Sequence, residues 1–195
     1  MSVEARLRGL RRVLAKDDVR ALSRRYFVAN GFDGTLTTIG VVVGAYLSGI
    51  ADGTVVIGIG LGAAVGLGTS GVWSVWEIER AETSRARENL EAAMLTSLEG
   101  TRLTRDLRNA QIVLALSSAS GPVLAILIML SPFLLVGIAY GMLVGVLLSI
   151  VIGITLLATV GAYMGLISRQ RWYVAAIRMG LAGIVVAIIS ILLPG

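Results

Sequence analysis

The amino-acid sequence predicts an all-α integral membrane protein with five transmembrane helices, a cytoplasmic N-terminus and a short cytoplasmic helical hairpin between spans two and three. Three observations predict this fold. The 195-residue chain is 56% hydrophobic and only 15% charged, a composition far more apolar than that of a soluble domain. Its uncharged runs reach the roughly 20 residues that a helix needs to cross a bilayer. Its basic residues gather in three places along the chain.

The first 26 residues hold eight of the seventeen Lys and Arg residues and lack the apolar core of a cleavable signal peptide. The apolar residues that fall near helical spacing between these charges are Leu7, Leu10, Leu14, Val19 and Leu22. We therefore expect residues 1–26 to form a basic amphipathic cytoplasmic segment. It either lies on an anionic membrane surface or is an ordinary solvated helix. Because the charges lie beside membrane spans, no nucleic-acid partner is expected.

The apolar runs place the five spans. They are predicted at about 28–50, 54–76, 110–130, 135–167 and 173–193. The resulting segments are 1–26, the first two spans in 27–76, an acidic and basic cytoplasmic helical segment in 77–109, and the last three spans in 110–195. The "SPF" at 131–133 is the expected turn between spans three and four. Span four is long, so tilt or a bend is expected.

The basic residues fix the predicted orientation. Eight lie before span one, six between spans two and three, and three at Arg169, Arg171 and Arg178. With five spans, loops that carry basic residues alternate with loops that carry none. The positive-inside rule then places the N-terminus and residues 77–109 in the cytoplasm and the C-terminus outside.

The chain contains neither cysteine nor histidine. Disulfides, thiolate metal sites and the usual proton shuttle near neutral pH are therefore excluded. Any metal site must use oxygen ligands or methionine sulfur, a set that suits hard or borderline divalent ions. No nucleophile–base pairing and no catalytic motif is present, so the protein is not expected to be an enzyme.

Four stretches, in this order, resemble the vacuolar iron transporter family, and most closely the short archaeal-type branch of these divalent-cation transporters. They are "NGFDGTLTTIGVVVGAYLSG" at 30–49, "GLGAAVGLGTSGVWSVWEIERAE" at 60–82, "SASGPVLAILIMLSPFLL" at 118–135 and "GAYMGLISRQRWYVAAIRMGLAGIVVA" at 161–187. The resemblance covers about residues 28–193. Its structural residues here are Gly34, Gly66 and Pro122.

The resemblance implies a homodimer of five-span subunits in the plasma membrane of a prokaryote. It implies export of a divalent cation, Fe²⁺ or Mn²⁺, from the cytoplasm in exchange for protons. The metal ion is then the transported substrate, and no tightly bound cofactor is expected. The expected partners are the lipid bilayer, a second copy of the chain, divalent cations and protons.

Asp33 matches the aspartate in the first span of the family. An ionised residue within a span costs a few kcal/mol, so it needs a functional reason. Asn30 and Thr37 lie one turn before and after it on the same helical face. The alternative is that Asp33 lies at the cytoplasmic end of the span and caps a helix or pairs with an arginine.

The second span departs from the pattern of the better-known members. Where they carry a glutamate and a methionine, this chain carries Gly62 and Ser70. The expected translocation path is thereby reduced to Asp33, Asn30, Thr37, Thr69 and Ser70. In a dimer, two Asp33 carboxylates facing across the two-fold axis would restore a site with two carboxylates.

Residues 77–109 resemble the metal-gathering helices of the family. Glu88, Glu91 and Met94 are spaced by three residues and share a helical face. With Asp33 and Glu99, they complete the expected metal ligands. However, Arg80, Arg85 and Arg87 interleave with the glutamates, a pattern that is also typical of a solvated, salt-bridged helix face.

Two functions follow from the sequence. The first is a transporter of divalent metal cations with proton antiport. The second is a non-transporting membrane scaffold or regulator that keeps the transporter fold but lacks the second-span metal ligands.

Overall fold

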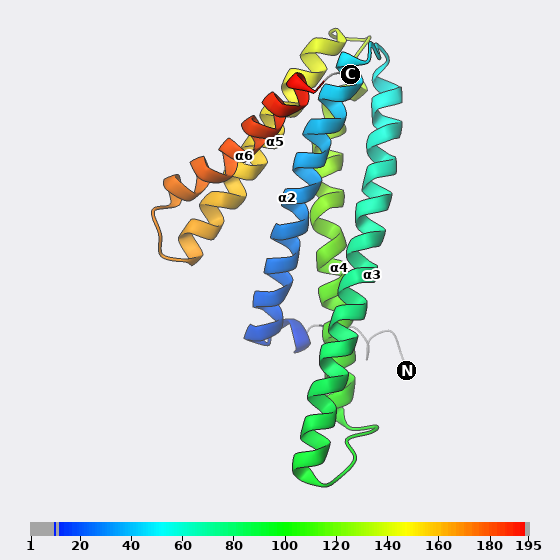
Figure 1. The fold of residues 1–195 in the computed structure, drawn as a ribbon, viewed down its shortest axis with the longest axis vertical. Coiled ribbons are helices and arrows are strands. Elements are labelled where there is room, and N and C mark those ends of the chain that lie inside the picture. Colours follow the sequence, from blue (N-terminus) through cyan, green and yellow to red (C-terminus); the bar gives the residue numbers. More distant parts are fainter. Residues whose placement is uncertain (1–9, 11, 194–195) are drawn as a thin grey trace. The chain divides into compact units, whose positions relative to one another are not determined.

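The computed structural model describes residue 10 and residues 12–193. The structure is 86% helix, and its described residues form no β-strand. Figure 1 shows the elements in chain order: α2 (Asp17–Leu47), α3 (Gly53–Met94), α4 (Arg102–Leu130), the short 3₁₀ helix η1 (Ser131–Leu135), α5 (Met142–Ile167) and α6 (Trp172–Leu192). Much of the expected N-terminal amphipathic segment, including Leu7, lies outside the described residues.

Five helical segments among the described residues are long and apolar enough to cross a membrane. They are α2, α3, α4 together with η1, α5 and α6. In the most apolar window of α6, only 11% of the residues are buried inside the protein. Such an apolar and outward-facing surface requires lipid or another apolar partner. These helices indicate a multi-pass membrane protein.

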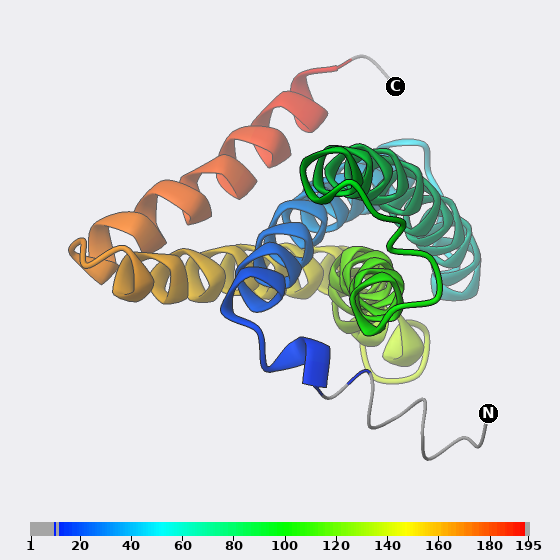
Figure 2. The same ribbon diagram turned by 90° about the horizontal axis from the view of Figure 1, so that it is seen from below.

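Residues in the left-handed backbone conformation follow the ends of α2 and α3, and a threonine side chain caps the start of α4. After α2, Gly49 adopts a left-handed conformation with φ of 78°, which is typical of a helix C-terminus. After α3, Leu95 and Gly100 have φ of 51° and 72°. The Thr101 Oγ1 atom then accepts a hydrogen bond from the Thr104 backbone N–H at 3.4 Å, a capping interaction at the start of α4. The 95–101 connection between α3 and α4 is visible in Figure 2.

The expected fourth span, 135–167, is wrong at its beginning, because α5 starts only at Met142. The preceding residues form a turn in which Gly137 has φ of 83°. The Tyr140 hydroxyl donates a hydrogen bond of 2.6 Å to the Pro132 carbonyl oxygen and closes this turn. The run is apolar throughout, so hydropathy alone did not reveal the turn. The remaining helix has 26 residues, close to the length that one crossing needs.

The chain divides into two compact units, and three helices contribute to both. The first unit comprises Met1–Phe27 and Gly68–Ser120. In its core, Val13 and Val19 are buried together with Val75, Val113 and Leu114. The described part of the N-terminal segment therefore places apolar side chains in a protein core.

Polar contacts add to the apolar core of the first unit. The Lys16 ammonium forms a salt bridge of 3.0 Å with the Asp106 carboxylate. The Tyr26 hydroxyl donates a hydrogen bond of 2.9 Å to the Glu79 carboxylate. Between α3 and α4, the Ser118 hydroxyl donates to the Gly71 carbonyl oxygen at 3.0 Å. These bonds join segments that are far apart in the sequence.

The second unit comprises Val28–Leu67 and Gly121–Gly195. Its core is built from α2, α3, α4, η1 and α5, and fully buried members include Ile39, Val56, Ile126 and Met129. α5 and α6 are antiparallel neighbours, joined by a short connection at 168–171 (Figure 1). This unit contains Asp33 and the helix face on which it lies.

Candidate functional site

Close packing on one side of α2 sets the direction in which Asp33 points. A Cβ atom added to Gly34 would lie 2.6 Å from the Pro122 Cα atom of α4, so only glycine allows the two backbones to approach this closely. Thr35 and Thr38 are buried on the same side of the helix. Their hydroxyls donate to the Gly31 and Gly34 carbonyl oxygens at 2.8 Å and 2.7 Å. These hydroxyls are thereby satisfied within α2.

Asp33 and Thr37 lie on the outward side of α2 and are exposed. Asn30, one turn before Asp33, is half-buried and already has an interaction within the chain. The spacing of three and four residues places the three side chains on one helical face. The structure therefore brings together Asp33, Asn30 and Thr37 of the expected path on the outer face of α2.

The Asp33 carboxylate makes no hydrogen bond or salt bridge with any residue that the structure describes. Asp52, the other acidic residue in the described part of the second unit, has a clear local partner instead. Its Oδ1 atom accepts hydrogen bonds of 2.8 Å from both the Thr54 backbone N–H and the Thr54 hydroxyl. Asp33 thus neither caps a helix nor pairs with an arginine within the described chain.

The remaining expected path residues are placed differently. Thr69 and Ser70 are exposed on α3, but they belong to the first unit, whereas Asp33 belongs to the second. Gly62 and Gly66 are also exposed on α3, and a Cβ atom at either position would meet nothing within 4 Å. Gly66 therefore makes no close approach of the kind that Gly34 makes.

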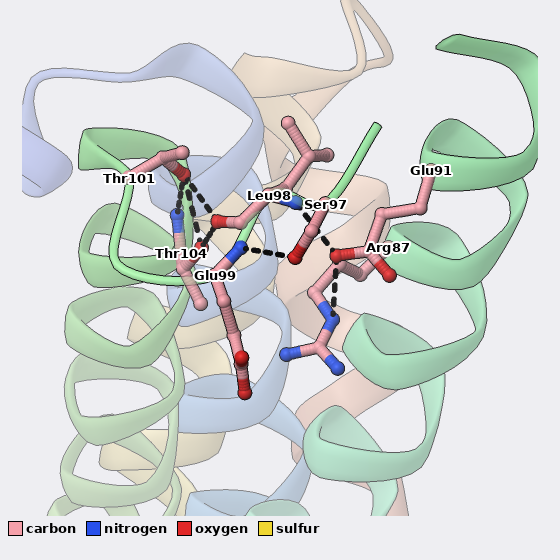
Figure 3. Close-up of polar contacts among 7 residues, drawn as sticks. All are labelled: Arg87, Glu91, Ser97, Leu98, Glu99, Thr101 and Thr104. Carbon is pink, nitrogen blue, oxygen red and sulfur yellow. Dashed lines mark hydrogen bonds and ion pairs between the residues drawn. The ribbon is translucent and has the colours of Figure 1, made fainter. Parts of the chain in front are cut away.

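The expected metal ligands near the end of α3 differ in their exposure and in their hydrogen bonds. Glu88 is exposed, and Met94 is 59% exposed. The Glu91 carboxylate accepts a hydrogen bond of 2.8 Å from the Leu98 backbone N–H and lies 3.6 Å from the Arg87 Nε atom (Figure 3). Glu91 therefore stabilises the connection between α3 and α4.

Further hydrogen bonds close this connection. The Thr101 and Thr104 hydroxyls both donate to the Leu98 carbonyl oxygen, at 2.7 Å and 2.6 Å (Figure 3). The Glu99 backbone N–H donates to the Ser97 hydroxyl at 3.3 Å, while Glu99 itself is exposed. Leu98 is consequently held at both its N–H and its carbonyl group.

No group of three or more His, Cys, Asp or Glu side chains that could hold a metal ion occurs among residue 10 and residues 12–193. The oxygen ligands that one chain offers around Asp33 are its carboxylate, the Thr37 hydroxyl and the amide oxygen of Asn30. One carboxylate with neutral oxygens can take part in a site for a divalent ion, but further ligands must complete the coordination.

A basic pocket was missed by the sequence analysis. It lies between α3 and α4 in the first unit, and its lining includes Arg80, Arg87 and Arg108. The signal was present in the sequence, since Trp76, Arg80, Thr83, Ser84 and Arg87 recur at helical spacing. In the sequence, these residues form a charged face that alternates with glutamates, and the facing residues of α4 cannot be paired with it from local sequence.

Comparison with known proteins gives a distant relative. The chain is 28% identical over 176 residues to an uncharacterized protein of Methanocaldococcus jannaschii, and the match covers 87% of each chain. No protein-family model matches the chain, and no solved structure matches it. The relative therefore shows that the chain has an archaeal counterpart of similar length.

Proposed function

We propose that the protein transports a divalent metal cation, Fe²⁺ or Mn²⁺, out of the cytoplasm in exchange for protons. The observation that carries the proposal is the exposed Asp33 carboxylate, which lies within an apolar helix and has no partner among the described residues. A charged side chain at the centre of a membrane span costs about 2.5–3.5 kcal/mol on insertion scales, and a charged side chain within a span is by default a candidate functional residue.

The chemistry of Asp33 suits exchange of metal for protons. An ionised carboxylate binds a divalent cation, and the same oxygen atoms can take up a proton when the cation leaves. Thr37 and Asn30 add neutral oxygen atoms on the same helical face. Such a set is hard in character, which fits Mn²⁺ and Fe²⁺ better than the soft ions that need sulfur.

A second copy of the chain would complete the site. Asp33 and Thr37 face outward from one subunit, so a homodimer that joins these faces would cover the carboxylate and supply a second one. A two-fold symmetric interface brings the same residue from each subunit to the axis. Two carboxylates and the adjoining hydroxyls would then provide most of the ligands that one chain lacks.

The proposed orientation is that of a prokaryotic plasma-membrane protein with its N-terminus in the cytoplasm and its C-terminus outside. The exposed Glu88 and Met94 side chains would then face the cytoplasm, where they could collect metal ions. Glu91 would contribute less, because Leu98 already occupies its carboxylate. Metal ions and protons are the proposed substrates, and no resident cofactor or enzymatic reaction is included.

Uptake of Fe²⁺ and Mn²⁺ into proteoliposomes tests the proposal. We expect wild-type protein to transport at least one of the two ions, Asp33→Glu to retain part of the rate, and Asp33→Asn to lose it. Asp52→Asn is the matched control, because it removes a carboxylate that already has its hydrogen-bond partner. Equal transport by Asp33→Asn and wild type would contradict the proposed role of Asp33.

A membrane scaffold or regulator is the second candidate. It is favoured by the lack of any group of three His, Cys, Asp or Glu side chains that could hold a metal ion in the part of the chain that the structure describes. In that case, wild-type protein that is folded and inserted in both orientations would carry neither ion above the rate of empty liposomes. Asp33→Asn would then stabilise the protein, because it removes a charge from the span.

A further inference from the structure

We propose that the basic pocket of the first unit binds a phosphate group, carried either by an anionic lipid headgroup or by a free phosphate. The basic pocket has a volume of about 300 Å³ and is lined by Trp76, Arg80, Thr83, Ser84, Arg87, Thr104, Leu107, Arg108 and Gln111. This volume is at the lower end of the range of small-ligand sites, about 300–1,000 Å³.

Two helix faces build the pocket. α3 contributes residues 76, 80, 83, 84 and 87, and α4 contributes residues 104, 107, 108 and 111. Each set repeats at the spacing of one helical face. The two faces are held together beside the pocket by the Gln111 side-chain amide, which donates to the Glu79 carbonyl oxygen at 3.3 Å. The pocket is therefore a product of ordered helices and not of a loop.

The lining is suited to an anion. It contains three arginines and three hydroxyl groups but no Asp or Glu. Guanidinium groups bind phosphate oxygens through paired, charge-assisted hydrogen bonds, and hydroxyls can donate to the remaining oxygens. A divalent cation would be repelled by the same lining, so this pocket is distinct from the proposed transport site.

Arg80 and Arg87 each have one ion-pair partner, and Arg108 has none among the described residues. Arg80 lies 3.7 Å from Glu77, with both side chains more than half exposed, and such a pair contributes little. Arg108 forms no salt bridge with any residue that the structure describes. Its guanidinium is available to a ligand.

Arg87 provides the most specific indication. Its Nε atom is buried and has no hydrogen-bond partner within the described structure. The nearest carboxylate, that of Glu91, lies 3.6 Å away and forms an ion pair without a hydrogen bond (Figure 3). A buried donor without an acceptor is costly and calls for an explanation. A small movement of the Arg87 side chain would bring this donor to a phosphate oxygen in the pocket, which would supply the missing acceptor.

The place of the pocket along the chain fits a headgroup. Trp76 ends the second apolar run, and tryptophan is enriched where a span meets the membrane surface. The arginines follow within three turns of α3, and basic pockets between helices on the cytoplasmic side of a membrane bind anionic headgroups. A soluble phosphate compound would meet the same arginines and hydroxyls, so the experiment must separate the two sources.

The test measures binding to full-length protein by two probes. Inorganic phosphate is titrated into protein in uncharged detergent micelles. Separately, thermal unfolding is compared in nanodiscs of phosphatidylcholine alone and of phosphatidylcholine mixed with phosphatidylglycerol. Arg87→Gln and Arg108→Gln should each weaken binding by roughly tenfold, because each loses charge-assisted hydrogen bonds. Arg85→Gln is the matched control, since Arg85 is exposed on α3 outside the pocket lining.

Ser84→Ala keeps every charge and removes one exposed pocket hydroxyl, so it tests the proposal even if an arginine variant fails to fold. It should weaken binding severalfold. Binding of phosphatidylglycerol without inorganic phosphate would identify a lipid headgroup, and the reverse would identify a soluble phosphate compound. The proposal is overturned if wild-type protein responds to neither probe, or if Arg85→Gln weakens binding as much as Arg108→Gln does.

Discussion

Gly34 of α2 and Pro122 of α4 are in direct backbone contact in the second unit, where a Cβ atom on Gly34 would lie 2.6 Å from the Pro122 Cα atom. Pro122 is fully buried, and α4 continues through it as one helix. This contact fixes the rotation of α2 about its own axis. It thereby turns the neighbouring residue, Asp33, to the outer face of the unit.

Gly34→Ala is expected to destabilise the protein by about 1–3 kcal/mol, because the added methyl group collides with backbone atoms that cannot move aside easily. Gly44→Ala is the matched control on the same helix, where a Cβ atom meets nothing within 4 Å. We expect it to be neutral or slightly stabilising. Thermal unfolding in one detergent compares the two, and equal effects would contradict the contact.

Glu91→Ala is expected to loosen the connection between α3 and α4, because the Leu98 backbone N–H loses its carboxylate acceptor. The expected loss of stability is about 1 kcal/mol. Hydrogen exchange should accelerate at residues 95–101. Glu91→Gln keeps an acceptor oxygen and should restore much of the protection.

Glu88→Ala is the control for this experiment, since Glu88 is exposed one turn away and has no partner among the described residues. Unchanged exchange at Leu98 in Glu91→Ala, or the same acceleration in Glu88→Ala, would show that Glu91 does not hold the connection.

Asp52 should make stability depend on acidic pH. Hydrogen bonds from the Thr54 backbone N–H, and next from the Thr54 hydroxyl, lower the pKa of Asp52 from its ordinary value of 3.8. A carboxyl group with a lowered pKa stabilises the folded state above its unfolded pKa, and this contribution is lost as the pH falls through the folded pKa. Stability should therefore decline below about pH 4 as Asp52 becomes protonated.

Asp52→Asn removes this titration while its side-chain oxygen still accepts from Thr54. Thermal unfolding between neutral and acidic pH should show a smaller decline for the variant than for wild type. An identical decline in both proteins would mean that Asp52 contributes no pH dependence.

Most of the helical architecture could be predicted from the sequence, because membrane spans leave a strong local signal. The apolar runs gave five segments, and the structure contains five helices of sufficient length and hydropathy among its described residues. Hydropathy did not reveal the turn at Gly137, because the uncharged, largely apolar run continues through that turn into the following helix. The sequence of 77–109 also predicts a helix that extends span two and breaks near Gly100, and α3 does continue to Met94 as a single helix.

The candidate site was only partly predictable. Asp33 stands out as a carboxylate in an apolar run, and its spacing from Asn30 and Thr37 gives a shared face. The close contact between Gly34 and Pro122 cannot be predicted from local spacing, because the two residues are far apart in the sequence. The role of Glu91 was likewise hidden, because its partner is the backbone N–H of Leu98 and not a side chain. The basic pocket also needs two distant helix faces.

The most direct test of the proposed role of Asp33 is a simultaneous measurement of metal and proton flux in proteoliposomes that contain a pH-sensitive dye. Wild type and Asp52→Asn should move Fe²⁺ or Mn²⁺ with protons in the opposite direction, and Asp33→Asn should move neither. Metal movement without any proton flux in wild type, or coupled flux that persists in Asp33→Asn, would contradict the account.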